Sequence, residues 1–342
     1  MSELVITATL MRGGTSKGVF LRASDLPDEG PARDQIILAL LGSPDPMQIN
    51  GLGGTHSSTS KLVAVSPSDD PDSDIDYLFA QIAIDEPTVD YQGNCGNLTT
   101  AVAPFAIDEG LVPVEGDLAT LTVRNLNTGV RIRSSVPLQD GRSSVEGDLS
   151  IAGVPGTGPA ITTDYLDPGG SVLAGALPTG NVRDRIDLAD GTSIDVSIMD
   201  VTSPHVYVRA VDVDSADLDR LEMIRSACAA AVSLNSLAIP RLVIIGPGTD
   251  EAADLEGKAV SMQRIHHAFP MTGALCTAAA ALIEGTLAHE ASTYRGEGPI
   301  RLRHPKGVVE VRADVEGQTV RSVGVTRTAR RLLRGDAYVV VP

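Results

Sequence analysis

The sequence predicts an α+β fold in which two domains repeat one plan. Its 342 residues are enough for two domains of ordinary size, each with its own core. Short segments of alternating apolar and polar residues, such as 129–133, predict antiparallel strands. Two alanine-rich helices open with similar stretches, residues 96–101 and 273–278, which indicates a duplicated domain.

In the first half, Val- and Ile-rich segments predict strands, and two longer apolar segments predict helices. The helix over residues 30–42 is amphipathic and ends at Gly42, ahead of Pro44. The helix over residues 98–109 contains Pro104, which should kink it or end it early, because proline lacks the N–H that the helix needs. The expected strands span residues 3–11, 19–21, 62–65, 77–84, 121–124, 129–133 and 143–147.

The second half repeats strands and helices of the same composition. One helix is expected from Ser215 to about Leu234, with Cys228 on its apolar face. A second, alanine-rich helix opens at Met271 and carries Cys276, and both thiols are expected to be packed in the core. The expected strands span residues 193–199, 205–208, 242–245, 301–313 (a hairpin) and 338–341.

The composition argues against several classes of partner. The 27 basic and 44 acidic residues give a net charge of −17, which argues against nucleic acid and against an anionic membrane surface. A small anionic substrate is compatible with this charge, because a few arginines and helix N-termini can make a locally positive pocket. No apolar run reaches about 18 residues and no charged leader opens the chain, so neither a spanning helix nor a signal peptide is expected. Three cysteines without metal or disulfide spacing fit a reducing cytoplasm, which is the expected location.

A glycine-rich turn, residues 12–18, joins the first two predicted strands. One interpretation is that its backbone N–H groups, with Arg12 or Lys17, meet a carboxylate; the alternative is a solvated turn. The turn is not a P-loop, because Ser16, Lys17 and Gly18 follow in the wrong order and a strand comes next.

A second polar stretch, residues 51–61, holds three glycines and five hydroxyl side chains, with His56 and Lys61. An apolar strand begins directly after the lysine. Lys61 is therefore either a surface charge at the edge of a strand or an ammonium group drawn into a polar pocket.

The stretch of residues 94–97 (NCGN) places the thiol of Cys95 at the start of a helix. Unpaired backbone N–H groups and the positive end of the helix dipole favour a thiolate at such a position. Cys95 is therefore expected to accept a proton.

With these stretches in view, the chain resembles the PrpF family, which shares the diaminopimelate-epimerase-like fold. The similarity runs in order along nearly the whole chain and is carried by residues 11–18, 42–46, 53–54, 59–61, 76–79, 94–97, 177–181 and 327–330. The family includes 2-methylaconitate isomerases, methylitaconate isomerases and 4-oxalomesaconate tautomerases. The resemblance implies two pseudo-symmetric domains, each a curved, mostly antiparallel sheet wrapped around a central helix, with the active site between them.

The same resemblance divides the chain. Residues 1–182 are expected to form the N-terminal domain and residues 183–324 the C-terminal domain. The last strand, residues 325–342, is expected to return to the N-terminal domain.

The wider fold uses two cysteines, one at each helix start, as acid and base. Cys95 matches the first, but Pro270 and Met271 occupy the second position, and Cys276 lies inside the helix. This departure argues against amino-acid racemisation, and the resemblance implies that Lys61 is the second proton carrier. Moving a double bond along an unsaturated acid needs a base, an acid and groups that hold enolate-like charge. Cys95 and Lys61 supply the two carriers, and the sequence does not decide which of them removes the proton.

The helix starts and the two polar loops are expected to bind the carboxylates of the substrate. The predicted binding residues are Arg12, Thr15, Ser16, Lys17, Ser57, Ser58, Asn94, Gly96, Asn97, Arg264, Met271, Thr272 and Gly273. The expected activity is a cofactor-independent isomerisation of a small di- or tricarboxylate, with no metal, nucleic acid or membrane involved. A homodimer is compatible with the sequence.

Within the family, residues 46–51 and the modest chain length resemble the oxalomesaconate tautomerases and methylitaconate isomerases. Ser57 and Ser58 resemble the methylaconitate isomerases instead. The sequence favours the tautomerase.

Other interpretations stay open. Residues 58–61 also fit the S-x-x-K pattern of serine acyl-enzymes, although a strand follows and the partner motifs S-D-N and K-T-G do not occur. A non-catalytic tricarboxylate-binding protein would share the binding residues but have no use for Cys95. His56, His266 and His267 lack a further ligand at zinc spacing, so hydrogen bonding is their expected role.

Overall fold

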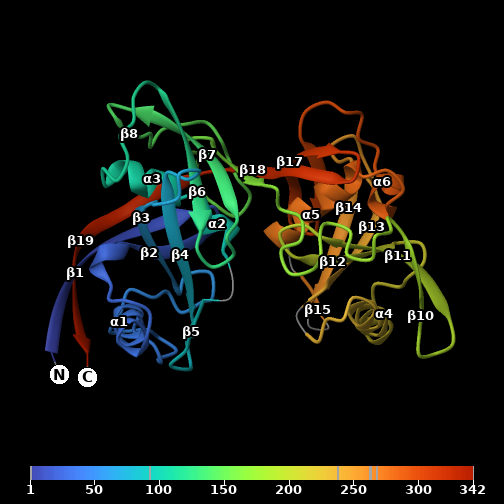
Figure 1. The fold of residues 1–342 in the computed structure, drawn as a ribbon, viewed down its shortest axis with the longest axis horizontal. Coiled ribbons are helices and arrows are strands. Elements are labelled where there is room, and N and C mark those ends of the chain that lie inside the picture. Colours follow the sequence, from blue (N-terminus) through green and yellow to red (C-terminus); the bar gives the residue numbers. More distant parts are fainter. Residues whose placement is uncertain (1, 92–93, 237–238, 262–263, 267–268, 342) are drawn as a thin grey trace. The chain divides into compact units, whose positions relative to one another are not determined.

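The computed structural model describes residues 2–91, 94–236, 239–261, 264–266 and 269–341. The chain forms two compact units, Met1–Thr163 with Thr326–Pro342, and Asp164–Val325 (Figure 1). The last strand, β19 (Ala329–Val341), pairs antiparallel with β1 (Ser2–Gly13). The units are groups of residues in mutual contact. A domain is a part of the chain that folds independently, which these contacts do not test. The predicted domains, with boundaries at 182/183 and 324/325, therefore stay a prediction.

The described residues of the first unit form a mixed sheet and three α-helices. Its further elements are β2 (Ser16–Arg22), the 3₁₀-helix η1 (Ala23–Asp25), α1 (Pro31–Leu41), β3 (Lys61–Pro67), β4 (Ile75–Ile82), β5 (Val89–Asp90), α2 (Gly96–Thr99), α3 (Val102–Asp108), β6 (Leu118–Asn125), β7 (Arg131–Gln139), β8 (Arg142–Ser143) and the start of β9 (Ile161–Leu166). The strands pair in the order β19, β1, β2, β3, β4, β6, β7. Neighbours are antiparallel, except that β2 runs parallel to β3 and β4 to β6.

Strand alternation gives this sheet two packed faces. On one face, Val19, Leu62 and Ala80 belong to the same buried cluster as Leu40 of α1. On the other face, Phe20 meets Phe105 of α3, with 5.5 Å between the ring centroids. The helices α2 and α3 therefore cover the face opposite α1.

The helix predicted over residues 98–109 is divided into α2 and α3 at Thr100 and Ala101. Pro104 lies four residues after Thr100, so it cannot donate to the Thr100 carbonyl and its ring would collide with that oxygen. The prediction that Pro104 interrupts the helix is confirmed, with the break on its N-terminal side.

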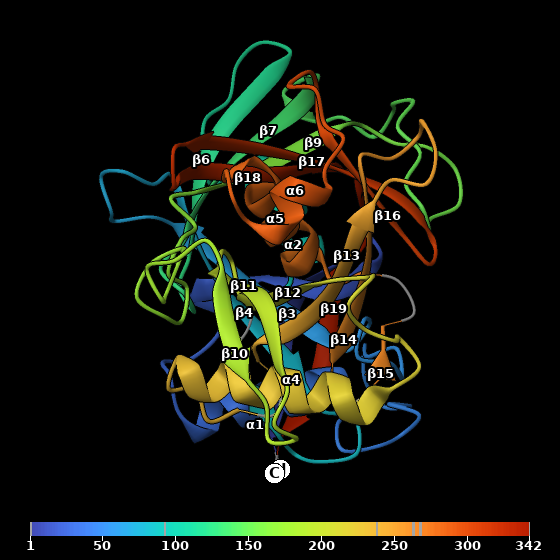
Figure 2. The same cartoon turned by 90° about the vertical axis from the view of Figure 1, so that its right-hand side faces the viewer.

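The second unit holds a sheet of the same kind, with α4 on one face and α5 on the other (Figure 2). Its elements are β10 (Asp184–Asp187), β11 (Ser193–Asp200), β12 (Pro204–Arg209), α4 (Leu218–Ala231), β13 (Arg241–Pro247), β14 (Leu255–Ser261), β15 (Arg264–Ile265), α5 (Met271–Leu282), α6 (Leu287–Ala291), β16 (Ile300–His304), β17 (Gly307–Glu316) and β18 (Thr319–Arg327). Every residue of α5 from Gly273 to Ala281 is buried, so α5 is the central helix of this unit. Cys228 and Cys276 are both buried, as predicted, and burial raises the pKa of each thiol to about 12.

The pairing of strands in the second unit repeats that of the first. From β1 to β7 and from β11 to β17, successive pairs are antiparallel, parallel, antiparallel, parallel and antiparallel. In chain order, α4 stands between β12 and β13 as α1 stands between β2 and β3. Likewise, α5 stands between β14 and β16 as α2 and α3 stand between β4 and β6. The predicted α+β fold with a duplicated domain is confirmed.

Two predicted strands differ from those observed. The strand predicted at 143–147 is wrong beyond Ser143, because the Ser144 hydroxyl bonds the backbone N–H and carbonyl of Glu146 and closes a local turn. The last strand begins at Ala329, earlier than the 338 expected from the alternating pattern and later than the 325 expected from the domain division, because the basic segment from Ala329 on also pairs with β1. In the described part of the chain, none of the helices has the length and apolar character needed to cross a membrane.

Candidate active site

Cys95 is the N-cap residue of α2, as the sequence predicted. Its Sγ atom lies 3.7 Å from Oγ of Ser16, at the start of β2. The Cys95 backbone is held on both sides: its N–H donates to Oδ1 of Asn94 (2.7 Å), and its carbonyl accepts from N–H (2.9 Å) and Oγ1 (3.1 Å) of Thr99. The thiol thus has a fixed position beside the tip of the β1–β2 hairpin.

Glycines allow this hairpin to touch α2. A Cβ atom on Gly13 would lie 2.4 Å from the carbonyl oxygen of Asn97, and one on Gly18 would lie 2.8 Å from Cδ1 of Leu98. At the hairpin tip, Thr15 Oγ1 accepts a hydrogen bond of 3.1 Å from Asn97 Nδ2. The close approach explains why the turn is rich in glycine and how it brings Ser16 to the cysteine.

Lys61 is the first residue of β3 and its side chain is drawn inside the unit. Only 9% of the residue is exposed, and its Nζ atom donates a hydrogen bond to Oε1 of Gln81. The same Nζ lies 5.1 Å from the centroid of the Phe79 ring. Gln81 is itself oriented, since its Nε2 atom donates to the Ser60 carbonyl at 2.9 Å. The interpretation of Lys61 as a surface charge is therefore wrong.

The strand β4 places Tyr77, Phe79 and Gln81 at alternate positions, so their side chains share one face of the sheet. The Tyr77 hydroxyl lies 3.3 Å from Asn94 Oδ1 and 3.1 Å from Thr99 Oγ1, next to Cys95. Burial raises the pKa of Tyr77 to about 12, so the phenol stays protonated. Cys95 and Lys61 accordingly lie on the same face of β4, one beside Tyr77 and the other beside Phe79 and Gln81.

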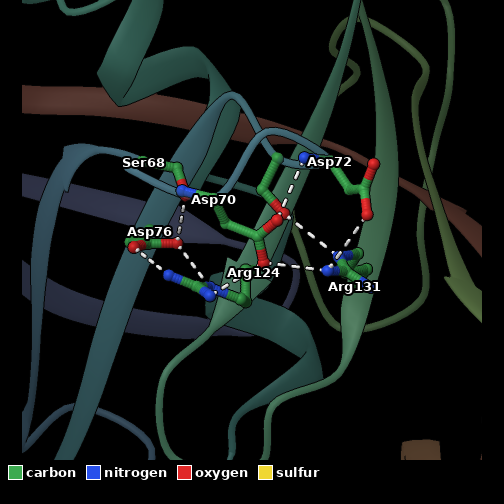
Figure 3. Close-up of polar contacts among 7 residues, drawn as sticks. Ser68, Asp70, Asp72, Asp76, Arg124 and Arg131 are labelled. Atoms are coloured by element: carbon green, nitrogen blue, oxygen red, sulfur yellow. Dashed lines mark hydrogen bonds and ion pairs between the residues drawn. The ribbon is translucent and has the colours of Figure 1, made fainter.

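Ion pairs outside this face anchor β4 to its neighbours (Figure 3). Arg124 of β6 binds Asp76 with two of its nitrogens, at 2.8 and 2.6 Å, and also binds Asp70. Arg131 of β7 binds Asp70 and Asp72, which lie in the acidic loop between β3 and β4. The acidic loop is thereby tied to two strands.

The side chain of Asn127 binds the backbone of Phe79, which lies between the part of β4 that pairs with β6 and the part that pairs with β5. Its Nδ2 atom donates to the carbonyls of Phe79 (2.8 Å) and Tyr91 (2.7 Å), and its Oδ1 accepts the Phe79 N–H (2.8 Å). The amide therefore acts like a residue of a neighbouring strand and fixes the ring over which Lys61 lies.

Two charged residues predicted to bind substrate lie elsewhere. In the hairpin register, Gly13 pairs with Ser16 and Arg12 pairs with Lys17, so alternation places the two cations on the face opposite Ser16. One guanidinium nitrogen of Arg12 donates to the carbonyls of Gly14 (3.0 Å) and Thr328 (2.8 Å). Arg12 and Lys17 are thus brought to the hairpin but not to the face that holds Cys95.

Ser57 and Ser58 belong to the loop before β3. The Ser57 carbonyl accepts from Nε2 of Gln81 at 3.2 Å, so the loop touches the partner of Lys61. The Ser58 hydroxyl lies 2.9 Å from Nδ1 of His56 and its backbone carbonyl accepts from Lys17 N–H at 3.0 Å. Lys61 contacts Gln81, and a strand follows it, so the geometry does not resemble the S-x-x-K arrangement of a serine acyl-enzyme.

In the second unit, Met271, Thr272 and Gly273 form the first turn of α5, as predicted. Oγ1 of Thr202 donates to the Thr272 carbonyl at 3.2 Å. Arg264 lies on the short strand β15 with an exposed side chain. His266 donates its backbone N–H to the Ala259 carbonyl, whereas His267 lies outside the described residues.

Sequence reasoning assigned no role to Tyr77, Gln81 or Asn127. The stretch 76–79 was part of the family resemblance, but no pattern within it distinguishes a site residue from a core residue. The signal for Gln81 is its register opposite Lys61, which becomes visible only once the strands are paired.

The comparisons with known proteins cover the whole chain. The sequence model of the family described as "PrpF protein" matches residues 3–340. A "3-methylitaconate isomerase" of Eubacterium barkeri is 37% identical, over 98% of this chain and 98% of the relative. A "4-oxalomesaconate tautomerase" of Pseudomonas putida is 35% identical, over 98% of this chain and 96% of the relative.

Solved structures agree with these relatives. A methylitaconate-delta-isomerase crystal structure superposes with a TM-score of 0.94 at 37% identity, covering 99% of this chain and 96% of the other. A hydroxyproline epimerase from Agrobacterium vitis superposes with a TM-score of 0.54 at 10% identity, covering 99% of this chain and 94% of the other, and shares the fold alone.

Proposed function

The chain belongs to the PrpF family, and from this premise we propose that it moves a proton and a double bond within an unsaturated di- or tricarboxylate, with Cys95 and Lys61 as the proton carriers. The enzyme class, isomerase, is confirmed, because relatives along nearly the whole chain are named isomerases or tautomerases. The alternative of a non-catalytic binding protein has no comparable support.

The observation that carries the proposed mechanism is the position of two proton-bearing groups on one face of β4. Moving an allylic double bond requires one group to remove a proton from a carbon and another to deliver a proton elsewhere on the same carbon skeleton. A thiol and an ammonium group, each held by its own partner, supply this pair. Ser16 lies beside the sulfur, and Gln81 accepts a hydrogen bond from the nitrogen.

The negative charge that develops during the reaction also needs a binding partner. Removal of the proton spreads charge over the double bond and the adjacent carboxylate or carbonyl, as in an enolate. The first N–H groups of α2, at Gly96 and Asn97, follow Cys95 directly and are placed to donate to such an oxygen. In this proposal the thiol and the oxyanion donors come from the same helix start.

The relatives' names give the candidate substrates: 3-methylitaconate, 4-oxalomesaconate and 2-methylaconitate. Each of these acids carries at least two carboxylates near a carbon from which an allylic or carbonyl-activated proton can be removed. The sequence features favour 4-oxalomesaconate, and the three acids together make the test panel.

Proton NMR in deuterated water tests the proposal directly. The wild-type protein is expected to exchange vinylic, methylene or methyl protons of one acid for deuterium while the double bond moves. Cys95→Ala and Lys61→Met are each expected to lower the rate about 10²- to 10⁴-fold, the usual contribution of an acid or base. Lys306→Met, at an exposed lysine in the β16–β17 turn, is the control and should leave the rate unchanged.

Two results would contradict the proposal. The absence of exchange with all three acids would argue against the reaction class. Exchange at the wild-type rate in both Cys95→Ala and Lys61→Met would instead show that other residues carry the proton.

A further inference from the structure

The duplication assigns Lys61 a counterpart in the second unit. The adjacent strands β2 and β3 contain the segments 18–22 (GVFLR) and 61–67 (KLVAVSP), and β12 and β13 contain 205–209 (HVYVR) and 241–247 (RLVIIGP). In the parallel pairs, Val19 lies opposite Leu62 and Val206 lies opposite Leu242, so the two registers agree. The strands β3 and β13 each begin with a cation and end with a proline. The cation is Lys61 in β3 and Arg241 in β13.

The surroundings of Arg241 are those of an anion receptor. Burial lowers the pKa of its guanidinium group, and a guanidinium nitrogen lies 3.4 Å from Oγ1 of Thr272, in the first turn of α5. Within the described part of the chain, no carboxylate forms an ion pair with Arg241. By contrast, the buried Arg225 is paired with Glu222 at 2.6 Å. A half-buried cation without an acid beside it favours the binding of an anionic ligand.

His205, the strand neighbour of Arg241, points to the same turn of α5. Its imidazole is fully buried, with Nδ1 2.7 Å from the Ser203 carbonyl, which makes Nδ1 the protonated nitrogen. Among the described residues, Nε2 has no hydrogen-bond partner. A Cβ atom on Gly273 would lie 3.1 Å from this Nε2. A buried, unpartnered nitrogen facing the first helical turn is an independent sign that this turn receives a polar ligand.

We propose that Arg241, the Thr272 hydroxyl and the first-turn N–H groups of α5 form, within the second unit, a binding site for one carboxylate of a polycarboxylate, which makes Arg241 a specificity-determining residue for such acids. Arginine stays charged throughout the pH range of enzymes and offers a planar pair of donors to a carboxylate. The duplicated position therefore has two chemistries: a lysine that exchanges protons in the first unit and an arginine that holds charge in the second. This assignment rests on the proposed function, because it takes the ligand to be a polycarboxylate.

Binding of propane-1,2,3-tricarboxylate tests this proposal without turnover, because this acid has no double bond to move. Isothermal titration calorimetry is expected to show that Arg241→Met weakens its binding at least about tenfold, with Arg241→Lys in between because the charge remains without the planar pair of donors. Arg321→Met is the matched control: Arg321 forms an ion pair with Glu316 in which both side chains are more than half exposed, and binding should be unchanged.

Thermal unfolding separates a binding role from a structural one. Without the tricarboxylate, Arg241→Met should unfold at the wild-type temperature or higher, since it removes a half-buried charge that has no acid partner among the described residues. With the tricarboxylate, the wild type should gain more stability than the variant does. A variant that binds like the wild type would overturn the proposal. The proposal would also be overturned if Arg241→Met and Arg241→Lys both unfolded at a lower temperature than the wild type while the tricarboxylate stabilised them as much as it stabilises the wild type.

The two proposals fail in different ways. If the wild type binds propane-1,2,3-tricarboxylate through Arg241 but exchanges no protons with any candidate acid, the isomerase mechanism fails and the carboxylate site stands. If proton exchange occurs but Arg241→Met binds the tricarboxylate normally, the mechanism stands and the carboxylate site fails.

Discussion

The ammonium nitrogen of Lys61 lies 5.1 Å from the centre of the Phe79 ring. With the hydrogen bond to Gln81, this contact fixes the position of a side chain that otherwise has four rotatable bonds. Two neighbouring strands contribute to the arrangement: β3 bears the lysine, and β4 bears the ring and the amide. A proton carrier held in this way depends on its partners, which leads to the first prediction.

Gln81→Leu is expected to lower the proton-exchange rate about 10- to 100-fold, because the Lys61 ammonium group loses its acceptor and no longer keeps one position. The rate is measured by deuterium incorporation with the preferred acid. Gln139→Leu, at the exposed end of β7, is the control and should keep the wild-type rate. Equal rates in the two variants would show that Gln81 does not position Lys61.

The hairpin glycines lead to a second prediction. In Gly13→Ala, the new Cβ atom would lie 2.4 Å from the Asn97 carbonyl oxygen and 3.0 Å from Leu98 Cα, so the hairpin and α2 must separate. Both Ser16 and Cys95 would then shift, and the free energy of unfolding should fall by about 1–3 kcal/mol. The exchange rate should fall at least about tenfold.

Gly335→Ala is the matched control for this change. Gly335 also lies in a strand, β19, but among the described residues other than its chain neighbours no heavy atom lies within 4 Å of the place that its Cβ would take. Urea unfolding should show wild-type stability for Gly335→Ala. If Gly13→Ala proved as stable and active as this control, close packing of the hairpin on α2 would not be what positions the thiol.

Asn127 leads to the third prediction, since its amide replaces a strand partner of Phe79. Asn127→Leu leaves both the N–H and the carbonyl of Phe79 without their partner, which should cost about 2–4 kcal/mol of unfolding free energy. Asn127→Asp keeps the acceptor but loses the donors, so its loss should be smaller. Urea unfolding measures both, with Asn50→Leu, at an exposed loop asparagine, as the control. A loss no larger than that of Asn50→Leu would contradict this account.

The order of strands and helices was largely predictable from sequence, because local patterns decide it. Residues 3–11 alternate and form β1, the apolar segment that ends at Gly42 forms α1, and Pro104 interrupts its helix. The duplication was predicted from the two helix starts, although the strand segments around Lys61 and Arg241 repeat more closely. That closer repeat becomes evident when the strands are aligned by their pairing.

The site was predictable only in part, because it depends on contacts between segments far apart in the chain. Residue type and neighbours singled out Cys95, and the family resemblance singled out Lys61. Residue type also chose Arg12 and Lys17, which strand alternation places on the face opposite Ser16. Tyr77 and Gln81 owe their roles to the register of β4 against β3 and α2, which local patterns do not encode. The cytoplasmic location stays a prediction, and the sequence allows a homodimer without predicting one.

His205 leads to the last prediction, which concerns stability at mildly acidic pH. Burial, with a smaller effect of the neighbouring Arg241, lowers the pKa of His205 from 6.5 to about 3. Between these pH values the unfolded chain binds a proton at this residue and the folded chain does not, so stability rises with pH. The stabilising contribution is complete above about pH 6.5 and is lost as the pH falls, by about 1.4 kcal/mol per pH unit.

Comparison of His205→Gln with the wild type isolates this contribution. Carboxylates whose pKa the fold lowers, such as Glu109 beside Arg334 and Arg22, also add to acid sensitivity from about pH 5.5 downwards, where the unfolded chain begins to protonate them, but they do so equally in both proteins. Urea unfolding between pH 4.5 and 6 should therefore give a shallower pH dependence for His205→Gln than for the wild type. His289→Gln, at an exposed imidazole, should keep the wild-type slope. Equal slopes for wild type and His205→Gln would mean that the buried imidazole takes up its proton without unfolding, which contradicts a neutral His205 packed against the first turn of α5.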